Sequence, residues 1–370
     1  MSKKSFGALC VVTAIAVVLA IVGIAGRPRL ESSDTQGARI FPNLVKDVEG
    51  LRTVAIRHGG DSISLDWDGK GWHVRERGNY PADAEKVTGL IIGLAQMSKV
   101  EGKTKQEDRY ARLEVEDPQA KDAKSRQVAL IDVNGKEIAS LIIGKKQPGL
   151  GNKSGGTYVR LAGDPQVWLV NGEVTAETTL ADWLKKDIAD IKEPMVSRVT
   201  VTHPNGEKII VSRAPGAQNF SVENLPKGTQ PASFYIADDY GRLLTSMSLE
   251  DVAPVADKPF PKDKTITAVV DGGDGFQVAV DMAEINGQSW VKIKGTPPPA
   301  DKPAPADAAK PVDLRTNWAK VISEMNARAE GWVYQVPAFQ VAPLKRRMTD
   351  LLKKPDAPGA KSPASATSPG

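Results

Sequence analysis

The chain has 370 residues and a formal net charge of +4, from 49 Lys and Arg against 45 Asp and Glu. The charges are spread without a basic stripe, which makes nucleic acid an unfavourable partner, and the single cysteine excludes a disulfide within the chain. The length exceeds the roughly 100 to 200 residues of one domain, so two domains or one duplicated unit are expected.

The segment from Gly7 to Gly26 contains no charged residue. A helix of this length spans roughly 30 Å, the thickness of the hydrocarbon core of a bilayer. We therefore predict a cytoplasmic N-terminus at residues 1–6 and a transmembrane anchor at residues 7–26. The basic residues before the segment are less diluted by acidic residues than those after it, which favours a body outside the cytoplasm. In a Gram-negative bacterium this places the anchor in the inner membrane and the body in the periplasm.

A cleavable signal peptide is the alternative for this segment. Gly23-Ile24-Ala25 resembles a cleavage site, but a signal peptide has an apolar core of about 7 to 15 residues and this run is longer. Retention is therefore favoured. Cys10 lies inside the apolar run, where it fits a small membrane-embedded hydrophobe better than a lipidation site.

A polar juxtamembrane linker at residues 27–50 precedes a first repeat at residues 51–190. Alternating apolar residues from Val54 to Val74 predict a three-stranded antiparallel meander. A helix should follow from Asp83, which can cap it, because the apolar residues after it fall on one face. These are Val87, Leu90, Ile91, Leu94 and Met97.

A second group of strands is expected from Val128 onward. Asn134-Gly135 is typical of a two-residue hairpin, and further strands are predicted at residues 158–161 and 167–170. A short helix with Leu180, Trp183 and Leu184 on its apolar side should close the repeat.

The same order of patterns returns in a second repeat at residues 197–354, about 145 positions later. A long-period recurrence indicates a duplicated domain, so the predicted fold is α+β, with antiparallel meanders and covering helices in two copies. In the second copy we predict a helix over residues 231–247. Its expected buried residues are Phe234, Tyr235, Leu243 and Leu244.

Two Pro-rich segments interrupt this pattern. An insertion at residues 296–311 and a tail at residues 355–370 are too rich in Pro, Ala and Ser to build a core, and the tail should be disordered. After the insertion, Asp313 can cap a helix that ends near Gly331. Its expected apolar stripe is Leu314, Trp318, Val321, Ile322 and Met325.

The residues that usually carry catalysis do not form a recognisable constellation. His58, His73 and His203 fall in predicted strands without clustered ligands, so we predict no metal and no cofactor. No serine sits in a nucleophile elbow, and we predict that the protein is not an enzyme. Six of the seven tryptophans suggest a carbohydrate platform, but their positions in alternating strands and apolar helix faces favour core packing.

Residues 144–156, GKKQPGLGNKSGG, resemble a phosphate-binding loop at first sight. The Walker pattern requires Gly-Lys-Ser/Thr at its end, and here Leu150 follows Gly149, so the match fails. A flexible basic loop is the favoured interpretation, with contact to an anion, a lipid headgroup or a partner as the alternative. The candidate contact residues are Lys145, Lys146, Asn152 and Lys153.

Several runs resemble a known bacterial family. The run GW.V…YPADAEKV..LI..L from Gly71 to Leu94, the strands YVRL and VWLV, and DWLKKDI at residues 182–188 are similar to the domain-of-unknown-function 4340 family. The resemblance implies one N-terminal span and an association with ABC-type permeases and gliding-motility-like components. It implies no active-site residue.

Together these patterns predict a membrane-tethered periplasmic scaffold or accessory subunit of an ABC-type transport system. Its expected partner is the permease or another envelope membrane protein. The alternative is a carbohydrate- or lipid-binding module that uses the groove between the two repeats. The oligomeric state is left open.

Overall fold

The computed structural model describes residues 36–149, 155–172, 174–299 and 317–353. The predicted N-terminus and anchor, most of the Pro-rich insertion and the tail at 355–370 lie outside these residues. In the described part of the chain, no helix has the length and apolar character needed to cross a bilayer.

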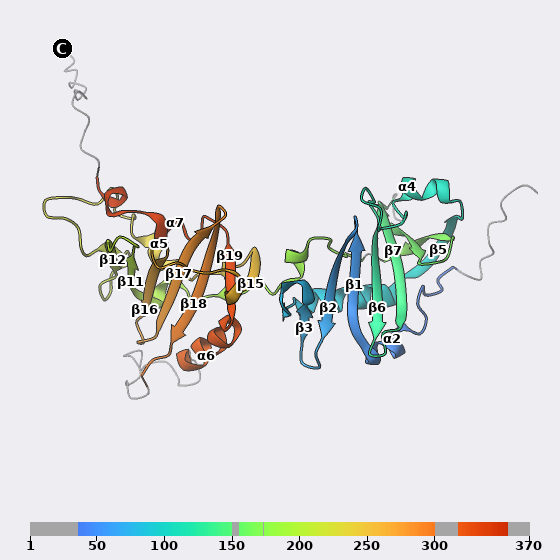
Figure 1. The fold of residues 1–370 in the computed structure, drawn as a ribbon, viewed down its shortest axis with the longest axis horizontal. Helices are drawn as coiled ribbons and strands as arrows, with labels where there is room; N and C mark the ends of the chain where they lie inside the picture. Colours follow the sequence, from blue (N-terminus) through green and yellow to red (C-terminus); the bar gives the residue numbers. More distant parts are fainter. Residues whose placement is uncertain (1–35, 150–154, 173, 300–316, 354–370) are drawn as a thin grey trace, which may run out of the picture. The chain divides into compact units, whose positions relative to one another are not determined.

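The described chain divides into two compact units (Figure 1). Unit 1 comprises residues up to His73 together with Ala84–Trp183, and unit 2 comprises Val74–Asp83 together with residues from Leu184 onward. Each unit is built on an antiparallel sheet with a few short helices, which confirms the α+β class. Residues 74–83 of the predicted first repeat therefore group with the second unit.

The first sheet has nine strands in the order β4-β3-β2-β1-β6-β7-β8-β9-β5, and its first strand, β4 Tyr80–Pro81, belongs to the segment that groups with unit 2. The bounds of the other strands are β1 Leu51–His58, β2 Asp61–Trp67, β3 Trp72–Val74, β5 Ser98–Thr104, β6 Arg126–Asp132, β7 Glu137–Gln147, β8 Gly156–Leu161 and β9 Val167–Asn171. The predicted meander is thus present, because β1, β2 and β3 are consecutive neighbours in the sheet. Val54 and Leu65 are fully buried, and Thr53, Ala55 and Ser64 beside them are buried as well, so both faces of the sheet are covered here.

The helices of unit 1 are short apart from one. They are α2 Leu44–Asp47, η1 Val48–Gly50, α3 Ala84–Gln96, η3 Glu107–Arg109, α4 Tyr110–Leu113 and η4 Leu180–Trp183. The predicted helix after Asp83 is α3, which buries Val87, Leu90 and Leu94 on one face.

The strands of unit 2 follow the order β13-β12-β11-β16-β17-β18-β19-β15. Their bounds are β11 Val196–Thr202, β12 Lys208–Ser212, β13 Ser221–Val222, β15 Asp251–Pro254, β16 Ile266–Gly272, β17 Gln277–Ile285, β18 Gln288–Thr296 and β19 Trp332–Val336. A separate ribbon pairs β10 Asp187–Ala189 with β14 Met247–Ser248. The helices are α5 Asp238–Gly241, α6 Trp318–Ala329, α7 Ala342–Lys345, η5 Glu193–Met195, η6 Val255–Asp257 and η8 Met348–Leu351.

Apart from β4, which has no counterpart in the second sheet, the two sheets share one strand order. They also share an irregularity, because the pairing of β1 with β6 shifts register between Leu51 and Thr53, and that of β11 with β16 shifts between Val196 and Arg198. A β-bulge retained at the same place is a feature of related backbones. The strand plan of unit 1 therefore recurs in unit 2.

Two local predictions are wrong in detail. The hairpin at Asn134-Gly135 has a wider turn than predicted: Gly135 N donates to Asp132 O, Asp132 N donates to Lys136 O, and Gly135 takes the left-handed conformation. The helix predicted over residues 231–247 is only the four residues of α5. Leu243 and Leu244 are buried as expected, but Phe234 and Tyr235 are 71% and 66% exposed.

The helix after the insertion is α6, and Asn317 caps it by accepting a hydrogen bond from Lys320 N at 3.1 Å. Asp313 and Leu314 lie outside the described residues. Trp318, Ile322 and Met325 are buried, as their spacing predicts.

Candidate functional site

The structure places the described part of the basic segment on a strand. Lys145 and Lys146 belong to β7 and are exposed, with Lys146 opposite Thr157 of β8. Asn152 and Lys153 lie outside the described residues. The hairpin base is fixed by Tyr158, whose hydroxyl donates to Gln147 Oε1.

The glycines of this segment have packing roles. A Cβ on Gly144 would lie 2.7 Å from Val115 Cγ1 and 2.8 Å from Glu114 O. A Cβ on Gly156 would lie 2.7 Å from Val170 O. These distances are shorter than any normal contact, so glycine at these positions lets neighbouring backbone approach closely.

The histidines bind backbone atoms or face a turn. His58 Nδ1 lies 2.8 Å from Ser125 O, and His203 Nε2 lies 3.0 Å from Arg346 O. His73 Nδ1 lies 3.8 Å from Asp68 Oδ2. No group of three or more potential metal ligands occurs within residues 36–149, 155–172, 174–299 and 317–353.

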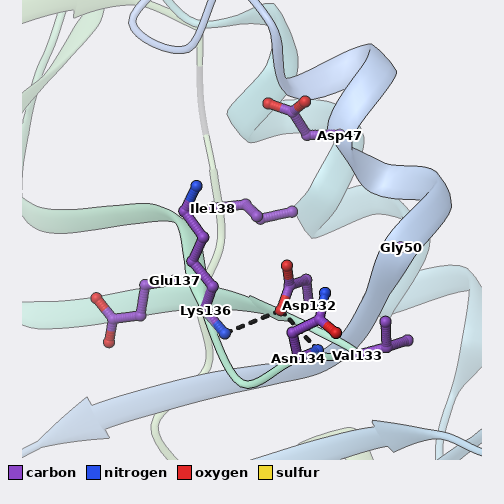
Figure 2. A pocket seen from close by; sticks show the side chains of 8 residues that line it. All are labelled: Asp47, Gly50, Asp132, Val133, Asn134, Lys136, Glu137 and Ile138. Atoms are coloured by element: carbon purple, nitrogen blue, oxygen red, sulfur yellow. Dashed lines mark hydrogen bonds between the residues drawn. The ribbon is translucent and has the colours of Figure 1, made fainter.

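A shallow pocket of about 320 Å³ lies in unit 1 beside the β6–β7 turn (Figure 2). The lining residues are Asp47, Gly50, Asp132, Val133, Asn134, Lys136, Glu137 and Ile138. In Figure 2 the Glu137 side chain points away from Asp132 and Asp47, so the three carboxylates do not converge on one point. This arrangement does not favour a cation site.

The carboxylate of Asp132 is engaged by its own turn. Its Oδ1 accepts from Asn134 N at 2.8 Å and from Lys136 N at 2.9 Å, drawn as dashed lines in Figure 2. The Lys136 hydrogen bond is the largest cause of the lowered pKa of Asp132. The Asp132 carboxylate in this pocket therefore stabilises its own turn.

A second organised contact lies in unit 2, made by residues 74–83, which we call the clasp. It contains η2 Arg75–Arg77 and β4 Tyr80–Pro81. The Arg77 guanidinium donates to both carboxylate oxygens of Asp251, at 2.6 Å to Oδ1 and 3.1 Å to Oδ2. The clasp therefore lies beside the edge strand β15.

Aromatic rings complete the clasp. Tyr80 is 3% exposed and packs edge to face on Trp332 at 5.1 Å and on Tyr334 at 6.2 Å. Its hydroxyl donates to Lys185 O at 3.2 Å. Burial raises the pKa of Tyr80 above its ordinary value and that of Tyr334 to about 12, so both phenols stay neutral at physiological pH.

A family model described as a domain of unknown function, DUF4340, matches residues 72–265. That range is more than half of the chain. The chain belongs to the DUF4340 family. No curated protein matches it, and no solved structure matches it.

The range that matches the DUF4340 model begins at β3 and ends directly before β16. It therefore includes the clasp and the exposed Phe234 and Tyr235, which sequence reasoning assigned to a core. Five of the six tryptophans considered above are buried, whereas Trp332 is half-buried in the clasp contact. The repeated Tyr-x-Ala-Asp at residues 80–83 and 235–238 was the signal that could have linked the two aromatic positions.

Proposed function

We propose that this DUF4340 protein is a membrane-tethered periplasmic scaffold or accessory subunit of an ABC-type transport system, without enzymatic activity of its own. The observation that carries the proposal is the exposure of large aromatic side chains on unit 2. Phe339 is 76% exposed, and Phe234 and Tyr235 are nearly as exposed. Such side chains are typical anchors of protein contacts.

The electrostatics of the body support a structural role. Asp68, Asp132 and Glu207 have lowered pKa values, and in each the largest cause is a hydrogen bond from backbone N–H. These carboxylates accept hydrogen bonds from the backbone and stay ionised. A general acid instead needs a raised pKa, so that it holds a proton at neutral pH.

The sequence supplies the tether. We infer that residues 7–26 hold the body at the inner membrane, and that the body arose by duplication of one α+β unit. The shared strand order and the shared bulge support the duplication. A retained span keeps the scaffold at a high effective concentration near a membrane partner, so a small contact surface is sufficient.

Photocrosslinking in native membranes tests the partner. A photoreactive phenylalanine analogue at position 339 should crosslink an ABC-type permease subunit, identified by mass spectrometry. The matched control is the same analogue at Lys320, an exposed position on α6 whose side chain is 71% exposed. Equal crosslinking from both positions, or products without a transporter component, would contradict the proposal.

Protease accessibility tests the location. In spheroplasts the body should be digested by external protease, and N-terminal sequencing of the membrane-bound protein should find the segment before Gly26 intact. Protection of the body, or a mature N-terminus after Ala25, would reject the tethered periplasmic arrangement. Binding of carbohydrate or lipid between the repeats stays the alternative prediction, and saturable glycan binding without any transporter crosslink would favour it.

A further inference from the structure

The clasp has a counterpart in the second repeat. In the first repeat it follows β3 and precedes α3, and in the second repeat residues 223–237 follow β13 and precede α5. Arg77-Gly78 of the clasp recurs as Lys227-Gly228. Both glycines are left-handed, with φ of 63° at Gly78 and 80° at Gly228. The later positions of the clasp recur as well, because Tyr80-Pro81-Ala82-Asp83 corresponds to Tyr235-Ile236-Ala237-Asp238.

The two segments differ in burial. Tyr80 is 3% exposed in its aromatic contact, whereas Tyr235 is 66% exposed. All residues from 226 to 235, which we call the second loop, are exposed. Phe234 and Tyr235 pack edge to face on each other at 5.4 Å. The second loop thus displays a cation, a left-handed glycine and an aromatic pair on the surface.

The surface that receives the clasp also has a counterpart. The clasp lies beside β15, which pairs with β19, and β5 and β9 hold the same places in the other sheet. Asp251 pairs with Gln335 as Glu101 pairs with Leu169. Glu101 therefore occupies the position of the carboxylate that binds Arg77.

The aromatic position is matched in the same way. Val333-Tyr334-Gln335-Val336 of β19 corresponds to Val167-Trp168-Leu169-Val170 of β9, which sets Trp168 at the place of Tyr334. The Trp168 ring carries Lys99 Nζ on one face, 4.4 Å from its centroid. An aromatic side chain that displaces Lys99 would pack on the same face of the indole.

Among the described residues, backbone hydrogen bonds cover the edge of β5 only at its start. Lys99 N donates to Ala38 O, and Gly37 N donates to Lys99 O, each at 2.8 Å. Beyond Lys99, the residues Val100–Lys103 are exposed. Glu101 binds Lys103 at 2.6 Å on the same strand, and its side chain is 47% exposed, so it can exchange this neighbour for another cation.

From these correspondences we infer that the second loop of one copy docks on the β5–β9 edge of a second copy. Lys227 binds Glu101 as Arg77 binds Asp251, and Tyr235 packs near Trp168. The interface is heterologous, since the loop and the edge are different surfaces, and it joins copies head to tail. This inference does not depend on the proposed transport function.

Disulfide trapping between two differently tagged full-length proteins tests the geometry. Both carry Cys10→Ser, so the engineered thiols are the only ones, and one carries Lys227→Cys while the other carries Glu101→Cys. After mixing in detergent and mild oxidation, a dimer that contains both tags should dominate. A dimer of Lys227→Cys with itself, or no dimer at all, would overturn the inference.

Charge exchange tests the energetics in purified protein. Lys227→Glu and Glu101→Lys should each weaken self-association in sedimentation by roughly tenfold, and the double variant should restore it. Lys320→Glu is the matched control, since it reverses an exposed lysine on α6 outside the second loop. Circular dichroism should show every variant folded. Unchanged association in both single variants, or a strictly monomeric parent protein, would overturn the inference.

Discussion

Arg77 and Asp251 are separated by 174 positions in the chain, yet the Arg77 guanidinium donates hydrogen bonds to both carboxylate oxygens of Asp251. The two side chains are 32% and 29% exposed, so water screens the pair only in part. Paired hydrogen bonds of this kind fix direction as well as distance. The contact holds the clasp at the edge of the unit 2 sheet.

Removing the guanidinium should therefore destabilise unit 2. We expect Arg77→Ala to lower the free energy of unfolding by about 1–2 kcal/mol, because it leaves Asp251 without its bidentate donor. Urea denaturation followed by fluorescence measures the change. Lys320→Ala removes only the 3.9 Å pair with Glu324 on α6 and should change stability by less than about 0.5 kcal/mol. Equal losses in both variants would show that the clasp contact adds nothing specific.

Two glycine substitutions should have opposite signs. Gly144→Ala should destabilise unit 1 by about 1–3 kcal/mol, since the new Cβ meets Val115 and the backbone of Leu113 and Glu114. Gly89→Ala lies in α3 with open space around its Cβ and should stabilise by up to about 1 kcal/mol. Thermal unfolding of the two variants beside the parent protein distinguishes them. A neutral Gly144→Ala would refute the packing role of this glycine.

Stability should fall as the pH drops below 6.5, partly because of His203. Burial is the largest cause that lowers the pKa of His203 below its ordinary 6.5, with Arg347 acting in the same direction. Between the two pKa values of His203, the unfolded chain therefore binds a proton at this residue and the folded protein does not. The loss begins near pH 6.5 and is complete below the folded pKa.

His203→Gln should flatten this part of the pH dependence. Denaturation at pH 7.5 and at pH 5.5 gives the slope, and His73→Gln is the control because His73 is less buried than His203. If the slope survives in His203→Gln and vanishes in His73→Gln, burial of His203 is not its cause.

Asn224 satisfies backbone groups on a part of the β12 edge that no strand pairs with in the described residues. Its Oδ1 accepts from Ile210 N at 3.0 Å, and its Nδ2 donates to Lys208 O at 2.7 Å, so one side chain replaces a neighbouring strand. We expect Asn224→Ala to cost about 1–2 kcal/mol and to promote aggregation, because the exposed edge can pair with another chain.

Asn224→Asp is the comparison variant. It keeps the acceptor for Ile210 but sets a carboxylate oxygen against the carbonyl oxygen of Lys208, so its loss should be at least as large as that of Asn224→Ala. Light scattering and denaturation measure the two effects. An Asn224→Ala protein that is as stable and as soluble as the parent would refute the edge role.

Much of the fold was predictable because its determinants are local. Val199 and Val201 alternate with polar residues and are fully buried in β11, and the apolar stripe of α3 faces the core as its spacing predicts. The edge strands β5 and β15 escaped prediction, since Ser98–Thr104 is polar and exposed and carries no alternation. Their pairing is supplied by β9 and β19, far away in sequence.

The aromatic positions show the same limit more sharply. A helix stripe placed Phe234 and Tyr235 in a core, but α5 begins only at Asp238, whose carboxylate accepts from Phe220 N at 2.8 Å. This tertiary contact fixes where the helix begins. Arg77 likewise has no local signal for its partner, and Lys145 and Lys146, which were expected in a flexible loop, lie on strand β7.

The clasp also means that unit 2 cannot be completed until late in translation. Tyr80 is translated long before Trp332 and Tyr334, so the growing chain carries this ring without its eventual neighbours while the rest of unit 1 is synthesised. A cut at any single peptide bond between Asp83 and Leu184 separates unit 2 from one of its own pieces. One strand plan thus occurs twice along the sequence, yet the chain has no point in that interval at which a cut leaves both units whole.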